Sequence, residues 1–375
     1  IYFLINYLWT TTIFNSVISS IAYFGPSFLT IIIFECIVNF MIDFGYCLPI
    51  FSGSQDKMAR TPMFNSIYDL HPSIVSSVEK LNFNSLWVAD HLSMPNSNSI
   101  LEGWTTISWA AGITKKIMLG NIHFNNLLRE PSYTAKIISS LDLLTKGRMN
   151  LFFDGGHPGT RNEVTTFGFN FLSDLERIEM LEESINLIKS LWESPKKNFK
   201  GKYYFVDDIF FNPLPYKRRD IPIWIGTLTP SSNTTEWNDR ISHTVARYGD
   251  WWNLTPIGIE SYKIANQEMN KIFKKEKRDF ESINKSVELE ILIAQNEKEL
   301  ISLKEKIKLN NSKEIFFGNW DEWSKTNLLG TPEQISEKLM QFNKLGVKNF
   351  MLWFLDSPSL NGAEIFSEEI IAKFN

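Results

Sequence analysis

"PSYTAKIISSLDLLTKGRMNLFFDGG" (residues 131–156) joins a helix pattern to a strand pattern. Pro131 opens the predicted helix 131–144, at a position where its missing N–H leaves no hydrogen bond unmade. The predicted strand 148–156 then runs through Asp154 into two glycines. A helix that leads directly into a strand is typical of α/β proteins, in which such alternation builds a parallel sheet.

The same alternation continues on both sides of this segment. We predict strands at 44–50, 84–90, 116–122, 148–156, 221–227, 250–254, 286–294 and 349–355. We predict helices near 66–81, 103–114, 131–144, 174–192, 236–248, 258–276, 331–346 and 359–373. The helix at 174–192 has further support, because Ser173 and Glu176 have the spacing of a capping box.

Eight strand–helix units predict an α/β fold of the (β/α)8 TIM-barrel type. Residues 200–215 indicate a two-stranded excursion from this barrel, and the charged stretch 295–326 an insertion late in it. The competing fold is a doubly wound open sheet. That fold is disfavoured, because no Gly-x-Gly-x-x-Gly turn follows the first predicted strand.

The first forty residues differ from the rest, since Glu35 is their one charged residue. We therefore divide the chain into an apolar extension, 1–40, and a barrel domain, 41–375. The first apolar stretch is long enough to cross a bilayer, whereas Glu35 would be costly in lipid. Three interpretations stay open: Met41 as the true start with an artefactual upstream segment, a membrane anchor, or a soluble extension.

Composition narrows the classes of function. Hydrophobic residues make up 43% of the chain and charged residues 21%, as in folded proteins. The net charge of −4, without a basic patch, argues against a nucleic-acid partner. Cys36 and Cys47 form neither a disulfide framework nor a zinc site, so we expect a reducing, cytoplasmic location.

Barrel active sites lie at the C-terminal ends of the strands, so we examined these ends first. They carry Asp90 and His91, then His123, Asn125 and Asn126, then Asp154 to His157, then Gly226 and Thr227, and finally Asp356. Gly155 and Gly156 leave room for a flat ring or a phosphate. Gly226 and Thr227, with Thr229 before a predicted helix, offer a phosphate seat. From the local pattern alone, ordinary turns and helix caps are the simpler interpretation.

Other chemistries find less support at these ends. A metal-dependent barrel hydrolase remains an alternative, with His91, His123 and His157 as ligands, although no His-x-His follows the first strand. Serine nucleophile catalysis lacks a Gly-x-Ser-x-Gly elbow. Paired acids for glycoside cleavage would have to come from Asp90, Asp154 and Asp356.

An ordered series of segments resembles the bacterial-luciferase-like oxidoreductases. It includes "SLWVADHL", "REPSYTAKIISSLDLLTKGRMNLFFDGG", "ERIEMLEESINLIKSLW", "IPIWIG", "ARYGDWWN" and "GTPEQISEKL" and spans about residues 43–356. The resemblance implies a TIM barrel that uses reduced FMN or the deazaflavin coenzyme F420. It does not extend upstream of Met41.

The resemblance also implies roles for single residues. His91 matches a histidine beside the flavin ring that acts as an acid or hydrogen-bond donor, and Asp90 would contact the cofactor or hold that histidine. Asn125 falls where the third strand passes under the ring, often near a strained or cis peptide. The remaining cofactor-binding positions implied by the family's glycine-rich turn and phosphate loop are Gly155, Gly156, His157, Glu163, Gly226, Thr227 and Thr229.

Departures from the family pattern put the phosphate contacts in doubt. The family usually has Gly-Gly where this chain has Gly226 and Thr227, and often an aromatic residue where it has His157. The common Arg-His-Pro before the third helix is replaced by Arg129, Glu130 and Pro131.

The first functional hypothesis is a monooxygenase that uses reduced FMN and oxygen on a small organic substrate, with FMN reduced by a separate flavin reductase. The first alternative is F420-dependent hydride transfer, and the second is the metal-dependent hydrolase. A third is a non-catalytic flavin-binding or membrane-tethered subunit. The resemblance implies a homodimer, and membrane contact is expected only if residues 1–40 are genuine.

Overall fold

The barrel is formed by eight parallel strands among the described residues. The computed structural model describes residues 42–52, 71–93, 99–228, 235–310 and 319–374. Residues Asp43–Lys373 form one compact unit. The barrel strands, in chain order, are β1 (Asp43–Leu48), β3 (Ser85–Ala89), β5 (Met118–Ile122), β7 (Leu151–Asp154), β10 (Ile223–Thr227), β11 (Trp251–Leu254), β12 (Asn284–Ile293) and β14 (Val347–Phe354).

The strands close into a ring in their chain order. The sheet runs β5-β3-β1-β14-β12-β11-β10-β7-β6, in which β6 (Phe124–Asn125) follows β5 after one residue and pairs with β7. A further parallel bridge between Leu119 and Met149 joins β5 to β7, so the two ends of the sheet meet. The TIM-barrel prediction is confirmed, and all eight predicted strands are present.

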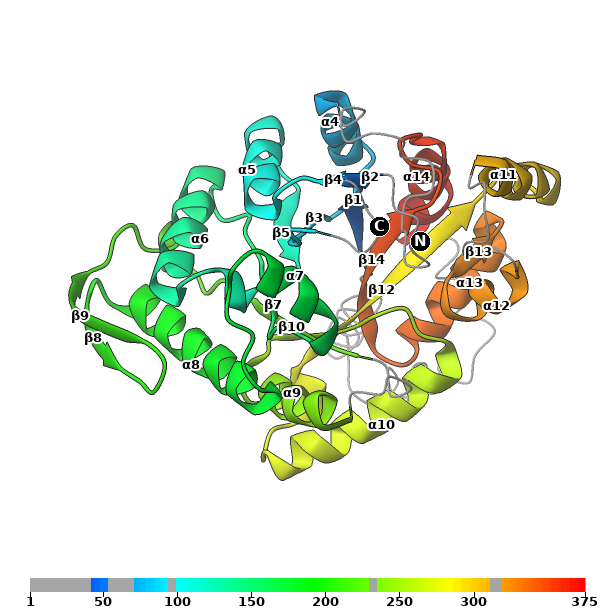
Figure 1. Ribbon diagram of the computed structural model, residues 1–375. Helices are drawn as coiled ribbons and strands as arrows, with labels where there is room; N and C mark the ends of the chain where they lie inside the picture. Colours follow the sequence, from blue (N-terminus) through cyan, green and yellow to red (C-terminus); the bar gives the residue numbers. More distant parts are fainter. Residues whose placement is uncertain (1–41, 53–70, 94–98, 229–234, 311–318, 375) are drawn as a thin grey trace, which may run out of the picture. The chain divides into compact units, whose positions relative to one another are not determined.

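Helices surround the strands, as Figure 1 shows. They are α4 (Pro72–Lys80), α5 (Gly103–Ile113), α6 (Pro131–Thr145), α8 (Asp174–Glu193), α9 (Thr235–Tyr248), α10 (Ile259–Lys275), α13 (Pro332–Asn343) and α14 (Asn361–Phe366), which continues as a π-helical turn (Ser367–Ile371) and α15 (Ala372–Phe374). The capping box of α8 is confirmed, because Ser173 and Glu176 bond to each other's backbone N–H groups. The first part of the predicted helix 66–81 lies outside the described residues.

The excursion differs from its predicted bounds, whereas the helices of the insertion lie within the predicted 295–326. The excursion is an antiparallel hairpin of β8 (Lys196–Lys200) and β9 (Phe205–Phe210), which starts earlier than the predicted 200–215. The insertion contains α11 (Glu297–Asn310) and α12 (Trp320–Thr326), and its residues 311–318 lie outside the described ones. Leu300, Ile307 and Trp323 of these helices form one apolar cluster with Leu292 and Leu355, which attaches the insertion to the barrel.

Several short elements besides β6 were missed by the sequence analysis. They are the antiparallel pair β2 (Phe51–Ser52) and β4 (Ser99–Ile100), the helix α7 (Arg161–Thr166), and β13 (Leu328–Gly330), which pairs in parallel with β12. Each offers too few residues for a periodic pattern. Of these, α7 matters most, because it carries a side chain of the candidate site.

Four aromatic side chains fill the barrel below the C-terminal strand ends, and we call Trp87, Phe152, Trp224 and Trp251 the aromatic layer. Trp224 stacks on Trp251 with ring centroids 4.1 Å apart, and Trp87 meets Trp224 edge-on at 5.1 Å. The barrel interior is therefore a packed core beneath its rim, as in other barrels of this kind.

The described helices do not include a membrane segment: none of them combines the length and the apolarity needed to cross a bilayer. The predicted extension 1–40 lies outside the described residues, so its three interpretations stay predictions.

Candidate active site at the barrel rim

A pocket opens at the C-terminal ends of the strands. It is lined by His123 next to β5, Asp154 and His157 after β7, Gly226 of β10, Trp237 of α9 and Thr255 after β11. The pocket thus gathers several of the strand-end residues that the sequence singled out. It lies directly on the aromatic layer, because the His123 ring meets the Phe152 ring edge-on at 4.2 Å.

His91 is held by a carboxylate at this rim. Its Nδ1 lies 2.9 Å from Oε2 of Glu163, and the other oxygen, Oε1, accepts the backbone N–H of Leu92 at 2.5 Å. The Glu163 side chain is 8% exposed, whereas that of His91 is 26% exposed. Glu163 therefore fixes both the turn after β3 and the orientation of the imidazole, and it comes from α7, an element that the sequence analysis missed.

The charge around His91 favours its protonated form. Burial acts to lower the pKa of His91, but the Glu163 hydrogen bond and charge, together with the charges of Asp154 and Asp90, outweigh it and raise that pKa above its ordinary value. With Nδ1 bonded to Glu163, Nε2 is the ring nitrogen that the described residues leave without a hydrogen-bond partner. The arrangement suits a group that donates a proton or a hydrogen bond through Nε2.

Asp90 takes a different role from the one expected. Its Oδ2 accepts the backbone N–H of Asn125 at 2.9 Å and Nη1 of Arg129 at 2.7 Å, and its Oδ1 accepts Nη2 of Arg129 at 2.9 Å. The side chain is 1% exposed. The idea that Asp90 holds His91 directly is therefore wrong, because Asp90 anchors the segment after β6 while Glu163 holds the histidine.

Asn125 lies where the resemblance implied, beside a cis peptide at Ile122–His123. Its side-chain oxygen accepts the N–H of Leu127 at 3.0 Å, and its backbone is tied to Asp90. Its buried Nδ2 has no partner among the described residues. A role for this amide at a cofactor remains a proposal.

The turn after β7 is built by Asp154, whose Oδ1 accepts the N–H groups of Gly156 at 2.8 Å and His157 at 3.1 Å. Gly156 has a φ of +74°, which glycine adopts without strain. Its carbonyl accepts Nε of Arg177 at 2.7 Å, and this arginine, in the first turn of α8, is fully buried. The turn is therefore fixed before any ligand binds.

The two glycines of this turn face protein atoms. A Cβ on Gly156 would come within 2.5 Å of the Leu127 side chain, and one on Gly155 within 3.2 Å of Leu181. The described structure thus explains both glycines by packing. Their approach to a cofactor remains a prediction.

Gly226 and Thr227 face opposite sides of β10. A Cβ on Gly226 would point at His123 and Phe152, 3.4 Å from each, which places Gly226 at the rim pocket. The Thr227 hydroxyl instead accepts Nε1 of Trp252 at 2.9 Å. Thr229 lies outside the described residues, so the predicted phosphate seat is described only in part.

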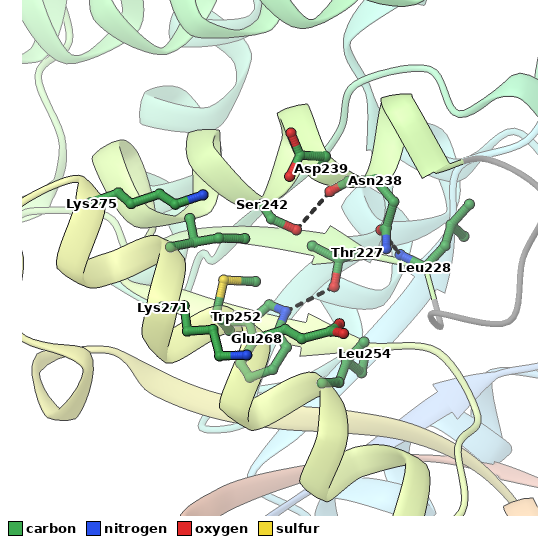
Figure 2. A pocket seen from close by; sticks show the side chains of 13 residues that line it. Thr227, Leu228, Asn238, Asp239, Ser242, Trp252, Leu254, Glu268, Lys271 and Lys275 are labelled. Carbon is green, nitrogen blue, oxygen red and sulfur yellow. Dashed lines mark hydrogen bonds between the residues drawn. The ribbon is translucent and has the colours of Figure 1, made fainter.

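A larger pocket lies between α9 and α10, and Figure 2 shows it beside Thr227. Its polar side chains include Asp239 on α9 and Lys271 and Lys275 on α10, and the Trp252 ring forms part of its floor. We place the candidate site in the rim pocket instead, because His123, His157 and Asp154 converge there at the strand ends.

His123, which the sequence offered as a strand-end residue, has a partner that the sequence did not reveal, Glu288. Nε2 of His123 lies 3.9 Å from Oε2 of Glu288, a carboxylate with no exposed surface. The available signal for Glu288 was an acidic residue within the otherwise buried strand β12. The metal alternative based on His91, His123 and His157 is not supported, because no group of three potential metal ligands is formed within the described ranges.

Comparison with known proteins now identifies the family. The sequence model of the luciferase-like monooxygenases matches residues 42–310, which is more than half of the chain. The chain belongs to the luciferase-like monooxygenase family. The family assignment confirms the resemblance stated from the sequence, and the matched region begins next to the predicted domain start at Met41.

Two curated luciferase-like relatives use different cofactors. An F420-dependent glucose-6-phosphate dehydrogenase of Amycolatopsis mediterranei is 29% identical over 156 residues, 40% of this chain and 45% of the relative. An FMNH2-dependent dimethylsulfone monooxygenase of Pseudomonas fluorescens is 25% identical over 251 residues, 60% of this chain and 65% of the relative. The chain thus spans about half the length of the dehydrogenase and somewhat less than two thirds of the monooxygenase.

Solved structures agree with the luciferase-like fold. A riboflavin lyase in complex with modified FMN and riboflavin superposes with a TM-score of 0.71 at 14% identity, and the match covers 89% of this chain and 91% of the lyase. At this level of identity the similarity supports the fold alone.

Proposed function

We propose that this luciferase-like protein is a flavin-dependent monooxygenase that acts on a small organic substrate with reduced FMN and oxygen. The observation that carries the proposal is His91, which Glu163 holds at the C-terminal end of β3 with its Nε2 left for a ligand. Family membership supports a flavin-type cofactor at this rim. The FMN-dependent relative of Pseudomonas fluorescens supports FMN in particular.

The pocket offers groups that suit such a cofactor. Nε1 of Trp237 is buried at the pocket wall and has no hydrogen-bond partner among the described residues, so it is a donor for a ligand. Gly226 lines the same pocket, where its Cα lies against the rings of His123 and Phe152. Asn125 contributes a second buried donor, Nδ2, near the same strand ends.

In this proposal each of the residues His91, Glu163 and Asp90 has a separate role. When bound, reduced FMN supplies electrons for the reaction with oxygen, as flavins do in other enzymes. His91 holds a proton at Nε2 and donates it, or a hydrogen bond, toward the bound group. Glu163 orients the imidazole and stabilises its charge. Asp90 acts through Arg129 and the Asn125 backbone, and so keeps the rim in place.

The chief alternative is F420-dependent hydride transfer, favoured by the dehydrogenase relative of Amycolatopsis mediterranei. In that case His91 would manage the substrate proton. A separate flavin reductase, a homodimer and a cytoplasmic location are further parts of the proposal, and each needs its own test.

Titration of the purified full-length chain with reduced FMN and with coenzyme F420, followed by fluorescence, decides between the two cofactors. Micromolar or tighter binding of reduced FMN supports the proposal, and preferential binding of F420 supports the alternative. Binding of neither would refute both.

A further inference from the structure

His123 reaches across the barrel interior to a buried acid. Its ring starts next to β5, passes over Phe152 of β7 and beside Gly226 of β10, and points Nε2 at Glu288 of β12. The His123 side chain is 23% exposed and lines the rim pocket, whereas that of Glu288 is 0% exposed. One member of the pair therefore faces a ligand, and the other is held in the core beneath it.

A hydrogen bond to the other carboxylate oxygen holds Glu288 in place. Oε1 of Glu288 accepts Nε1 of Trp353, a β14 residue, at 2.7 Å, which leaves Oε2 as the oxygen that faces His123. The edge-on contact with Phe152 restricts the imidazole in the same direction.

A carboxylate without exposed surface requires a compensating charge or hydrogen bonds, because its transfer from water to the protein interior is costly. Trp353 supplies a neutral donor, and a protonated His123 supplies the charge at 3.9 Å. Asp154 and His157 face the same pocket, and Glu290, bonded to Nε1 of Trp323, follows on the same face of β12. The carboxylates of Asp154 and Glu290 also favour a cation at His123.

We propose that His123 and Glu288 form a second histidine–carboxylate pair, which holds a positive charge at the floor of the rim pocket and favours the negatively charged, reduced form of the bound flavin. This inference rests on the proposed function for the identity of the ligand. Glu288 is a positioning residue that acts through His123, and His123 contacts the ligand. The pair is distinct from His91 and Glu163, so the C-terminal ends of the strands carry two such pairs with separate tasks: proton donation by His91 and charge stabilisation at the floor of the rim pocket.

The first test uses the full-length protein without cofactor. The titration of the His123 imidazole is followed by NMR in the wild type, in Glu288→Gln and in Glu290→Gln. Loss of the paired charge in Glu288→Gln is expected to move the titration midpoint of His123 down by about one pH unit or more. Glu290→Gln is the matched control, since it removes a buried carboxylate of the same strand but leaves the pair intact, and it should give a clearly smaller shift. Equal shifts in the two variants, or none in Glu288→Gln, would overturn the pair.

The second test measures the affinities of oxidised and of reduced FMN under anaerobic conditions. His123→Gln should weaken the reduced form selectively, so that the ratio of the two affinities falls about tenfold, and Glu288→Gln should lower it in the same direction. The second variant keeps the test decisive if the first does not fold. An unchanged ratio in both variants would overturn the stabilisation of reduced flavin while leaving the proposed function standing. A wild-type protein that binds neither form of FMN would refute the proposed function and the flavin contact together, and the NMR titration would still decide the pair.

Discussion

The buried ion pair between Asp90 and Arg129 gives the sharpest prediction for the rim. We consider Arg129→Met, which keeps a long side chain but removes the charge. The Asp90 carboxylate would retain the N–H of Asn125 and lose both guanidinium bonds, at 2.7 and 2.9 Å, although its side chain is 1% exposed. Breaking a buried pair by removing one partner costs about 3–5 kcal/mol, so we expect a loss of that size in the free energy of unfolding.

Part of that loss is not electrostatic, because the Arg129 guanidinium also lies 4.5 Å from the centre of the Phe124 ring. A double-mutant cycle with Asp90→Asn separates the two contributions, since the coupling energy reports the pair alone. We expect a coupling of about 2 kcal/mol or more, at the level of charge-assisted hydrogen bonds.

The assay is equilibrium urea unfolding of the full-length chain at pH 7. Arg240→Gln is the matched control, because its partner Glu236 lies 3.4 Å away on an exposed helix face and such pairs contribute about 0.5 kcal/mol or less. A loss below about 1 kcal/mol in Arg129→Met, or one no larger than that of Arg240→Gln, would show that Asp90 does not depend on Arg129.

Three further predictions concern protonation and packing. Glu163→Gln should lower the pKa of His91, and an NMR titration measures this change. Because folding raises the pKa of His91, the pair stabilises the folded protein fully below about pH 6.5, and this stability is lost as pH rises through the raised, folded-state pKa. Burial raises the pKa of Asp356 to about 6. The free energy of unfolding of the wild type should therefore fall by up to about 3 kcal/mol relative to that of Asp356→Asn as pH rises from about 4 to above 6. Urea unfolding at several pH values measures this difference. Gly120→Ala should destabilise the barrel by about 1–3 kcal/mol, because its Cβ would lie 2.3 Å from the Trp87 ring, and thermal unfolding measures this loss.

Each of these predictions has an outcome that contradicts it. An unchanged His91 titration in Glu163→Gln would remove the carboxylate's role, and parallel pH curves for the wild type and Asp356→Asn would refute the buried-acid argument. Gly112→Ala is the control for the glycine substitution: its Cβ meets nothing within 4 Å in α5, so a gain of about 0.5–1 kcal/mol is expected. Equal effects of the two alanines would contradict the clash with Trp87.

The fold was predictable because its signals are local and repeated. Apolar strands and helix starts, such as the capping box at Ser173 and Glu176, recur along the chain. Each further strand–helix unit strengthens the prediction of a barrel. The hairpin start at Lys196 was missed because β8 alternates exposed and half-buried residues and has no apolar run. The three-residue β13 (Leu328–Gly330) was missed because three residues are too few to establish an alternating pattern.

The candidate site was predictable only as a region. Asp90 and His91 are adjacent in the sequence, which suggested that they act on each other. Successive residues of an extended chain point to opposite sides, so Asp90 turns to Arg129 and His91 to Glu163. These partners are 39 and 72 residues away, and local patterns do not report such contacts.

Glu288 shows a second limit of sequence reasoning. In a barrel strand both faces are buried, so an acid within an apolar run has no marked face. The contact between Glu288 and His123 exists only in the closed barrel, which brings β12 opposite the end of β5.

The central claim is that His91 acts on a bound flavin-type cofactor at the barrel rim, and its most direct test is a comparison of kcat with the cofactor dissociation constant in His91→Ala. The account predicts that kcat falls at least about 100-fold while the dissociation constant of reduced FMN changes only a few-fold, as for the loss of a general acid. An unchanged kcat, or a loss of turnover explained entirely by weaker FMN binding, would contradict it.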